Sequence, residues 1–569
     1  MLWTVFTFCS MAVLVLTLIL SVIRGSQRMG HKINALHILL IGVFLANFLL
    51  LFPPYYNTVL AGNGLVNSLF MVFHDTLVLF TLGSDFNSVL ETYAAAIPAW
   101  LQTTYTVYGL FLYAFTPLLS AGFLLSFFRN ASAYWKYIFN YTKDVYVFSE
   151  MNEKTVALAL DIIKRDRGAS IIIAGQKKKD DEEDLSGALG AITFSKNVYE
   201  INLTMHSKHS RICFFYIKDD ASVNMEDAFF SLERYKERTN TEFFIFSPAE
   251  EHDSILNSVD TGKVIVRRVN SMQSFVHMFL YKEGKELFDT AEYMSDGRRR
   301  ISIALVGFGA YGREFARVLP WYCSQQGFVT EIHIIEKFDE PMATFRGSYP
   351  SLNYTDSDSF DPNCPYSITF HPVNVETEQF AKDAETISSF TYALVLTGDD
   401  DRNLRIAIRL RTLFRRLGTC PIIRTRVYNS TMSYISSELK NHNGQNYDIR
   451  MLGSLQETYS YESVIDSEWS THAKEELKTY NTPERWKFEY YHTTAITHAI
   501  YKKTALMLCI DTEGEEFKKY YHDSWCAYMY ARGYTFATIK DDMALGNPNL
   551  VRYEDLPAPY DNEKRKAIK

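Results

Sequence analysis

The chain has 569 residues, enough for about three or four domains of ordinary size. Aromatic residues make up 15 % of it and the formal net charge is -8, which excludes an intrinsically disordered chain and a global basic field for duplex nucleic acid. Its 7 cysteines are scattered, without a CxxC pair or a cysteine–histidine cluster at zinc spacing. We therefore expect a folded, reduced protein without a metal site.

Two long apolar segments open the chain. Residues 2–23 read LWTVFTFCSMAVLVLTLILSVI, and residues 33–52 read INALHILLIGVFLANFLLLF before Pro53 and Pro54. About 20 apolar residues suffice to cross the hydrocarbon core of a membrane. The first segment lacks the basic start and the cleavage site of a secretory signal, so we predict a retained transmembrane helix. A third span is predicted over residues 104–128.

Basic residues near these spans give them a direction. Lysines and arginines lie between the first two spans and after the third: Arg24, Arg28, Lys32, Arg129, Lys136 and Lys143. Residues 54–103 contain neither lysine nor arginine. By the positive-inside rule the N-terminus is outside and everything after the third span is cytoplasmic, which predicts a multi-pass protein of the cell membrane.

The segment at residues 65–86, LVNSLFMVFHDTLVLFTLGSDF, is too apolar for a plain outer loop. A re-entrant pore segment is one interpretation, because non-helical backbone at membrane depth is tolerated only inside protein or along a water-filled cavity. An amphipathic helix on the outer leaflet and a fourth, partial span are the alternatives. In the pore interpretation, Thr81, Gly83 and Asp85 lie where a selectivity region is expected.

The third predicted span contains Pro117 and Gly122. Proline removes an intrahelical hydrogen bond and small residues allow helices to approach closely, so this stretch is a candidate gate that bends or packs near a symmetry axis. Ordinary tolerance is the alternative, since both residues are common in membrane helices.

From residue 144 onward, short apolar runs alternate with amphipathic segments, which predicts parallel sheets with crossover helices. The first such unit starts with DVYVFSEMNEKTVALALDIIKRDRG and ends near residue 290. A second unit starts at Ile301 with ISIALVGFGAYGREFARVL. We therefore predict two Rossmann-like units in tandem.

The second unit carries a glycine-rich turn between strand and helix. Gly307, Gly309 and Gly312 form GxGxxG, and Glu336 ends the next predicted strand. Glycines at this spacing permit a tight turn, a close approach of backbone to a pyrophosphate and helix–strand packing, while the acid suits a ribose hydroxyl. NAD or another nucleotide as a regulatory ligand is one interpretation, and an inherited turn that binds nothing is the other.

The first unit has no such glycines. Its turn reads FSEMNEKT, in which Ser149 and Asn152 are able to cap the following helix. Capping accounts for these residues without a ligand, and we expect no dinucleotide there.

A basic helix is predicted in the second unit, within TGDDDRNLRIAIRLRTLFRRLG. Arg402, Arg405, Arg409 and Arg416 recur at three-, four- and seven-residue steps and therefore share one helical face. Pairing with acids of a neighbouring subunit is one interpretation of this face. A surface for phosphate groups or an oligonucleotide is the other.

Two stretches resemble a known family. DVYVFSEMNEKTVALALDI and YALVLTGDDDRNLRIAIRLR are similar to the regulator-of-conductance (RCK, Trk/Ktn-like) domains of ligand-gated potassium channels and transporters. The resemblance implies a gating ring of tetramers or octamers beneath a pore, with a nucleotide or ion as ligand. The pore itself departs from the potassium-channel pattern, because Ser84 and Asp85 stand where tyrosine and glycine are needed, which puts potassium selectivity in doubt.

The C-terminal stretch YHDSWCAYMYARGYTFATIKDDMALGNPNLVRYEDLP resembles the ryanodine-receptor-type (RyR-like) repeat, although Tyr521 and Ser524 depart from its usual Glu and Arg. Chains that combine membrane helices, RCK units and such a tail resemble membrane effectors of nucleotide-controlled bacterial anti-phage systems, the Hailong type among them. The expected domains are a transmembrane pore-like domain (1–140), two RCK-type domains (141–295 and 296–480) and a mostly helical RyR-like domain (481–569).

No motif supplies a nucleophile with its base, and no catalytic residue is nominated. His492 and His498 lie on a predicted helix without carboxylate or cysteine partners at ligand spacing. We therefore expect a homotetrameric, nucleotide- or oligonucleotide-gated ion channel or membrane-permeabilising effector, not an enzyme. A membrane-anchored, NAD-binding oxidoreductase is the alternative.

Overall fold

The computed structural model describes residues 2–26, 35–58, 65–81, 96–175, 189–386, 389–429, 439–479 and 489–556. The chain divides into two compact units. The smaller unit comprises Met1–Tyr141 with Ile192–Ile201, and the larger unit comprises Thr142–Ala191 with Asn202–Lys569.

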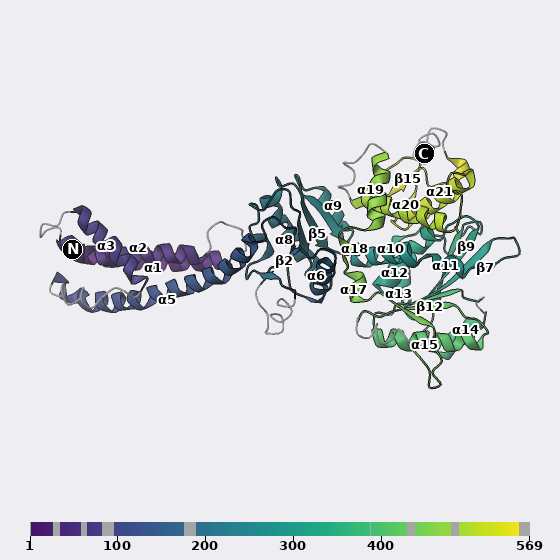
Figure 1. Ribbon diagram of the computed structural model, residues 1–569, viewed down its shortest axis with the longest axis horizontal. Helices are drawn as coiled ribbons and strands as arrows, with labels where there is room; N and C mark the ends of the chain where they lie inside the picture. The colour runs from purple at the N-terminus through teal and green to yellow at the C-terminus, as the bar shows by residue number, and fades with distance from the viewer. Residues whose placement is uncertain are drawn as a thin grey trace. The chain divides into compact units, whose positions relative to one another are not determined.

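The smaller unit contains the helices α1 (Leu2–Ser26), α2 (Ala35–Thr58), α3 (Leu65–Leu79) and α5 (Ala99–Ile138) (Figure 1). Two stretches, Leu2–Ser21 and Ile38–Tyr56, are long and apolar enough to cross a membrane. The third predicted span lies within α5, a helix of 40 residues that continues through Pro117 and Gly122.

Helix α2 does not end where the sequence predicted. It continues past Pro53 and Pro54 to Thr58. Proline has no N–H, so Pro54 leaves the carbonyl of Leu50 without its intrahelical donor. The Tyr105 hydroxyl, from α5, donates to this carbonyl at 2.9 Å, which replaces the lost bond and allows the helix to continue.

Buried polar side chains connect the three long helices. The Ser10 hydroxyl donates to the carbonyl of Ala46 at 2.6 Å and lies 2.9 Å from the Tyr108 hydroxyl. The side-chain amide of Asn47 donates to the Thr116 hydroxyl at 2.8 Å. Each such interhelical bond is worth about 1 kcal/mol in apolar surroundings, and together they fix which faces of α1, α2 and α5 meet.

Helix α3 has 15 residues, so at about 1.5 Å per residue it is shorter than a membrane span. The Tyr55 hydroxyl of α2 donates to the Asp75 carboxylate on α3. Of the three residues predicted for a selectivity region, Thr81 is exposed just after α3, whereas Gly83 and Asp85 lie outside the described residues.

The larger unit contains two mostly parallel sheets. Within this unit the first sheet runs β2-β1-β4-β5-β6. Its strands are β1 (Val145–Phe148), β2 (Ser170–Ile173), β4 (Ile212–Tyr216), β5 (Thr241–Phe246) and β6 (Ile265–Val269). The short strand β3 (Ile192–Thr193) belongs to the smaller unit. Its helices are α6 (Glu153–Arg165), α8 (Ala221–Tyr235), α9 (Glu251–Asn257), α10 (Ser271–Glu283) and α11 (Lys285–Asp289).

The second sheet runs β10-β9-β8-β11-β12-β13, with β7 (Glu292–Tyr293) antiparallel to β8. Its main strands are β8 (Arg299–Val306), β9 (Phe328–Glu336), β10 (Tyr366–Pro372), β11 (Tyr392–Val395), β12 (Ile422–Arg426) and β13 (Ile449–Leu452). Its helices are α12 (Ala310–Tyr322), α13 (Asp339–Ser348), α14 (Glu378–Thr386) and α15 (Asp400–Arg416).

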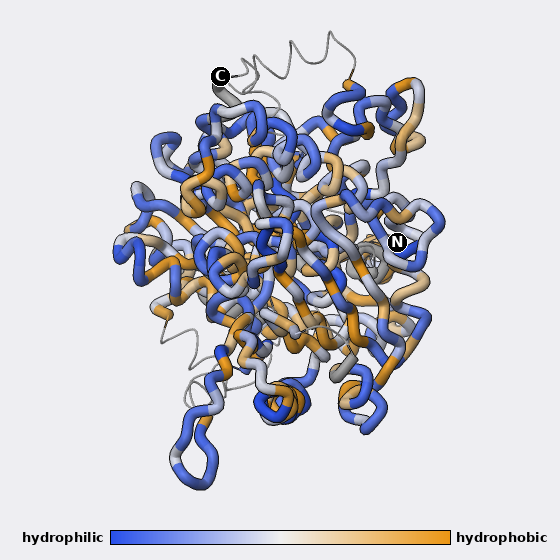
Figure 2. The backbone as a smooth tube through the Cα atoms, turned by 90° about the vertical axis from the view of Figure 1, so that its right-hand side faces the viewer, coloured by the Kyte–Doolittle hydropathy of each residue, from blue (hydrophilic) through white to orange (hydrophobic). Residues whose placement is uncertain are grey.

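Both sheets therefore have the doubly wound order of Rossmann-like folds, in which ligands bind where the strand order reverses. Their central strands are buried along most of their length, as sheets covered on both faces require. Figure 2 colours the backbone by hydropathy, with hydrophobic residues in orange. The prediction of two tandem Rossmann-like units is confirmed.

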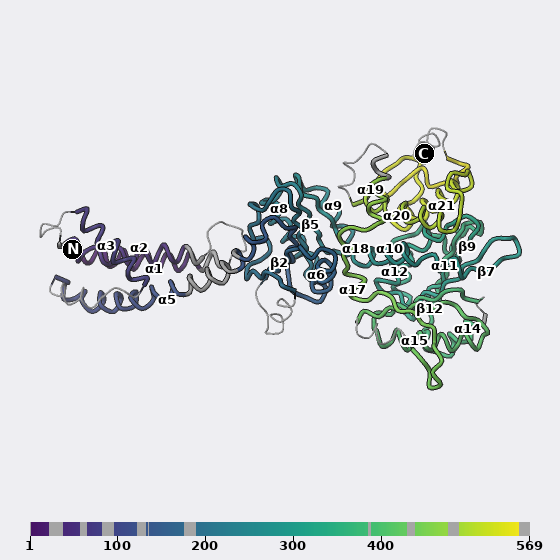
Figure 3. Tube along the Cα trace, viewed as in Figure 1, coloured from purple at the N-terminus to yellow at the C-terminus, as the bar shows by residue number. Residues whose placement is uncertain are grey.

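After β13 the chain returns to the first sheet. Helices α17 (Leu455–Thr458) and α18 (Tyr461–Val464) pack against α6, and the Tyr461 N–H donates to the Asp161 carboxylate at 2.8 Å. The chain continues through α19 (Glu468–Thr479), α20 (Glu489–Met507) and α21 (Glu515–Tyr530), in the green to yellow part of the trace (Figure 3). It ends in the short strands β14 (Thr535–Phe536) and β15 (Gly546–Asn547) and the 3₁₀ turn η5 (Tyr553–Asp555).

One buried arginine joins three parts of the larger unit. Arg317, on α12 beside the second sheet, donates to the Glu250 carboxylate at 2.7 Å, just before α9 of the first sheet. It also donates to the carbonyl of Ala531, after α21, at 3.0 Å, and lies 3.3 Å from the Glu314 carboxylate. Arg317 is 12 % exposed, so removing a partner would leave a largely desolvated charge less well compensated.

Arg411, in the middle of α15, is also structural. Its side chain is 1 % exposed and donates to the carbonyls of Pro421, Tyr447 and Asp448 at 2.7–2.9 Å. These bonds connect α15 to the segments that precede β12 and β13. Arg409, two positions earlier on the same helix, is exposed.

We expect the substitution Arg411→Met to destabilise the larger unit by about 3 kcal/mol, since it leaves three carbonyls without their buried donor. The measurement is thermal unfolding of the purified protein in detergent. Arg409→Met is the matched control and should leave the midpoint within error. Equal midpoints for the two variants would contradict the structural role of Arg411.

Candidate functional site

The glycine-rich turn lies between the end of β8 and the start of α12, where the strand order of the second sheet reverses. Gly307 has a φ of +92°, and a Cβ there would lie 2.9 Å from the backbone of Leu396. A Cβ on Gly312 would lie 2.2 Å from the carbonyl oxygen of Gly307. Backbone conformation and packing therefore require these two glycines, whatever binds nearby.

Gly309 is different. Its φ of -71° suits any residue, and a Cβ built there would meet no atom within 4 Å. It is the N-cap residue of α12, and no side chain caps this helix. By contrast, side chains of Asn152, Asp220, Asn270 and Asp399 accept hydrogen bonds at the starts of α6, α8, α10 and α15. The open space at Gly309 thus lies before a helix N-terminus, which favours an anion.

A cavity of about 310 Å³ opens in front of this turn. Its wall is formed by the turn, the end of β9 with the following residues, the loop at residues 373–375, Thr397 and Arg402. Arg402 donates to the Glu376 carboxylate at 2.9 Å, which holds the guanidinium at the wall. We call this space, lined by Gly307, Gly309, Glu336 and Arg402 among others, the turn cavity.

Glu336, predicted to bind a ribose, lines the turn cavity but already accepts hydrogen bonds. Its Oε2 accepts from the Phe308 N–H at 3.0 Å, and its Oε1 accepts from the N–H groups of Lys337 and Phe338 at 2.9 and 3.3 Å. A carboxylate offers about four lone-pair positions, so one remains for a ligand hydroxyl. The structure thus brings together Gly307, Gly309, Gly312 and Glu336, with the acid held rigidly by backbone.

The four predicted arginines of α15 behave in two ways. Arg402 is paired with Glu376 and lines the turn cavity, whereas Arg405, Arg409 and Arg416 are exposed. Within the described part of the chain, these last three side chains have no ion pair. They form an exposed basic face, which both interpretations of the sequence require.

In the first sheet, the predicted cap is confirmed at Asn152. Its side chain accepts from the Thr155 N–H at 2.8 Å and donates to the carbonyl of Ile217 at 3.0 Å. Ser149 does not cap α6, because its hydroxyl accepts instead from the Ile217 N–H at 2.9 Å. Both side chains therefore connect the ends of β1 and β4.

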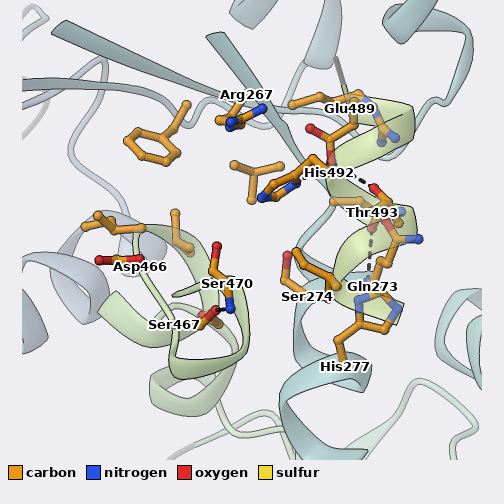
Figure 4. Close-up of a pocket in the computed structure, with 18 of the residues that line it drawn as sticks. Arg267, Gln273, Ser274, His277, Asp466, Ser467, Ser470, Glu489, His492 and Thr493 are labelled. Atoms are coloured by element: carbon orange, nitrogen blue, oxygen red, sulfur yellow. Dashed lines mark hydrogen bonds and ion pairs between the residues drawn. The ribbon is translucent and has the colours of Figure 1, made fainter. Parts of the chain in front are cut away.

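Sequence reasoning missed a second cavity, of about 200 Å³, beside β5 and β6 of the first sheet. Its walls come from the two strands, α10, the segment from Glu462 through α19, and α20, so we call it the junction cavity (Figure 4). Polar side chains predominate on its wall: Arg267, Gln273, Ser274, His277, Asp466, Ser467, Ser470, Lys474, Glu489, His492 and Thr493.

His492 has a carboxylate partner that the sequence interpretation overlooked. Its Nδ1 lies 3.4 Å from the Glu489 carboxylate, which also accepts from the Thr493 hydroxyl at 3.1 Å. The sequence does contain a signal for this pair, because a glutamate three residues before the histidine places both side chains on one helical face. Segments distant in sequence supply the rest of the wall, so no local motif marks this cavity.

Burial and charge set the ionisation of this wall. Burial by itself raises the pKa of Glu489, but the nearby His492, Arg267 and Arg268 outweigh it and lower that pKa to about 2. Burial lowers the pKa of His277 to about 3, and it also lowers the pKa of His492. Near neutral pH the cavity therefore holds an ionised Glu489 and a neutral His277 imidazole.

No protein-family model and no curated protein matches the sequence. The resemblance to gating-ring and RyR-like domains therefore stays a prediction.

We expect Gly309→Asp to fold normally and to weaken binding of nucleotides at the turn cavity by about tenfold or more, because a carboxylate would occupy the anion position before α12. Calorimetric titration with ATP and with NAD measures the effect. Gly312→Ala is the structural counterpart, and it should instead lower the thermal midpoint, since its Cβ has no room. Unchanged nucleotide affinity in folded Gly309→Asp protein would rule out this turn as the binding site.

Acid should destabilise the larger unit through His277. Its pKa is depressed from 6.5 to about 3 in the folded state, so stability is full above pH 6.5 and is lost as the pH falls towards 3. At pH 5 the loss amounts to about 2 kcal/mol. Thermal midpoints measured from pH 7 to pH 5 should fall less steeply for His277→Gln than for the parent, whereas the exposed control His209→Gln should follow the parent. Parallel curves for all three proteins would refute this assignment.

Proposed function

We propose that the protein is an oligomeric ion channel or membrane-permeabilising effector that opens or closes when a nucleotide binds the turn cavity. The observation that carries the proposal is Gly309. The absence of a side chain there is explained neither by backbone conformation nor by packing, and it leaves open space before an uncapped helix N-terminus. The same chain contains two helices that are long and apolar enough to cross a membrane, and ligand binding would act on the membrane through them.

The turn cavity suits a phosphate-bearing ligand in particular. Backbone N–H groups at the start of α12 provide donors, Arg402 at the wall provides a cation, and Glu336 retains capacity for a hydroxyl. The exposed Arg405 and Arg409 extend positive charge along α15. A longer ligand such as an oligonucleotide would place further phosphates on this face, and acids of a neighbouring subunit would occupy it in the other interpretation.

Ligand binding acts on the pore only through different affinities for the closed and open forms. In the proposed mechanism the larger unit assembles as a homotetramer, and binding changes the strain on α5, the helix that contains Pro117 and Gly122. The membrane spans number three, with the N-terminus outside and both Rossmann-like units in the cytoplasm. The resemblance to anti-phage effectors makes bacterial defence the proposed setting.

The alternative, a membrane-anchored NAD-dependent oxidoreductase, requires a proton-transfer group beside the nicotinamide. The described residues that line the turn cavity include no histidine, tyrosine or cysteine. Its ionisable groups are Glu336, Lys337 and Arg402, of which the first and last are held by partners. This wall suits binding better than hydride chemistry.

We expect purified protein in liposomes to release ions in a manner that depends on added nucleotide, and Gly309→Asp protein to lose that dependence. Dye or ion efflux with ATP, NAD and short oligoadenylates measures it, and native mass spectrometry reports the oligomer and any retained ligand. The matched control is Gly347→Asp, on α13, where a Cβ would meet no atom within 4 Å and which lies outside the turn cavity. If the protein is a monomer, releases no ions and oxidises or reduces NAD, the channel proposal is wrong and the oxidoreductase is supported.

A further inference from the structure

The crevice at the carboxyl ends of the second sheet differs on the two sides of β8. In a doubly wound sheet a dinucleotide spans the point where the strand order reverses, with one nucleotide on each side. Here that point is β8, which has β9 on one side and β11 on the other. The turn cavity lies on the β9 side. Among the described residues, Thr397 and Arg402 are its lining residues from beyond β11, and β12 supplies none.

A buried asparagine ties the ends of β11 and β12 together. Asn403, on α15, is 0 % exposed. Its Oδ1 accepts hydrogen bonds from the N–H and the hydroxyl of Thr397, just after β11, at 2.8 and 2.7 Å. Its Nδ2 donates to the carbonyl of Arg426, at the end of β12, at 2.9 Å. Polar groups that a ligand over these strands would use are therefore paired within the protein.

Side chains fill the space beyond the end of β12. The Arg426 guanidinium lies 4.0 Å from the centroid of the Tyr311 ring, on α12, and 5.2 Å from the centroid of the Tyr428 ring. The N–H of Tyr428 donates to the Asp400 carboxylate, at the start of α15, at 2.9 Å. Neither the guanidinium nor the two rings belong to the wall of the turn cavity.

The segment that returns to the first sheet covers these side chains. The Leu455 N–H, at the start of α17, donates to the carbonyl of Tyr428 at 3.0 Å. Both residues pack against the hydrophobic core of the first sheet. The half of the crevice beyond β11 is therefore occupied by the protein itself, whereas the half beside β9 is open.

The open half has an apolar side that suits a nucleobase. The Phe338 side chain, two residues after the end of β9, is 58 % exposed. Together with Pro341, Val373 and Val375 it lines the turn cavity on the side away from β11. Every nucleobase has a face that can stack on an aromatic ring, so this side favours a base without selecting which one.

Glu336 connects the apolar side to the glycine-rich turn. Its Oε2 accepts from the Phe308 N–H, within the turn, and its Oε1 accepts from the Phe338 N–H, at 3.0 and 3.3 Å. The carboxylate thus lies between the places for phosphate and base, where the ribose of one nucleotide belongs. The cavity volume of about 310 Å³ is at the lower end of the range of about 300–1,000 Å³ for small-molecule sites, which suits one nucleotide better than two.

We propose that the turn cavity binds a single nucleoside phosphate and excludes NAD and other dinucleotides. The base packs against Phe338, a ribose hydroxyl donates to Glu336, and the phosphates face Gly309 and Arg402. The second nucleotide of NAD would need the space that Arg426 fills. This inference rests on the proposed function, because it concerns the same cavity and names the class of its ligand.

Matched ligands test the proposal on the purified full-length protein in detergent. Calorimetric titrations compare AMP, ADP, ATP, GTP and UTP with NAD. NAD contains AMP as one half, so a difference between NAD and the adenine mononucleotides reports on the second half. We expect at least one mononucleotide to bind about tenfold or more tightly than NAD, and NAD not to displace it, because the second nucleotide would overlap packed side chains.

A variant of the apolar side locates the base. Phe338→Ala should weaken binding of the mononucleotide about tenfold, because the base loses its stacking partner. Phe360→Ala removes another exposed ring, outside the turn cavity, and should leave the affinity unchanged. Both side chains are exposed, so both variants should keep the thermal midpoint of the parent protein. Equal affinities of Phe338→Ala and the parent would overturn the assignment of the base.

The other outcomes separate this inference from the proposed function. NAD that binds as tightly as the best mononucleotide would overturn the inference and leave the ligand-gated channel proposal intact. Binding of short oligoadenylates without binding of any mononucleotide would do the same. Absence of binding by all of these ligands at millimolar concentration would refute both proposals.

Discussion

The arrangement of the larger unit depends on one buried charge that three of its parts must satisfy. Arg317 extends from α12 and reaches Glu250 beside the first sheet, Glu314 on its own helix and the carbonyl of Ala531 after α21. A guanidinium removed from water is tolerated only while its partners remain in place. Separation of the first sheet or of the C-terminal region would therefore leave a buried charge uncompensated. This requirement helps to hold the junction cavity between those parts.

The two cavities use the same physical principle in different ways. In the turn cavity, an uncapped helix N-terminus and a fixed arginine create a place for negative charge, and Gly309 keeps that place open. The wall of the junction cavity carries charges of both signs, and Arg267 interacts electrostatically with Glu489 there. Fixed positive charge at the turn cavity favours an anion. At the junction cavity the charges of the wall compensate one another, as Arg267 does with Glu489 and Lys474 with Asp466.

In the smaller unit, hydrogen bonds between helices satisfy polar groups in apolar surroundings. The Tyr105 hydroxyl satisfies the carbonyl that Pro54 leaves free, and Asn47 pairs with Thr116 beside Pro117. The bond from Tyr105 lets α2 continue where the sequence pattern alone predicts an end. A substitution at Tyr105 would therefore act through helix α2, although the residue belongs to α5.

The sequence alone determined the two Rossmann-like units, because buried parallel strands read as apolar runs and the glycine turn has a fixed spacing between strand and helix. It also determined the apolar helices and the basic face of α15, since helical periodicity is local. Only the tertiary structure decided that Gly307 and Gly312 are explained by packing while Gly309 is not. It also decided that Arg411 is buried, whereas Arg409 on the same helix is exposed. The junction cavity, too, was decided by folding alone. Arg267, Asp466 and His492 are far apart in the chain, and only the long-range packing of the first sheet, the returning segment and α20 brings their side chains around one space.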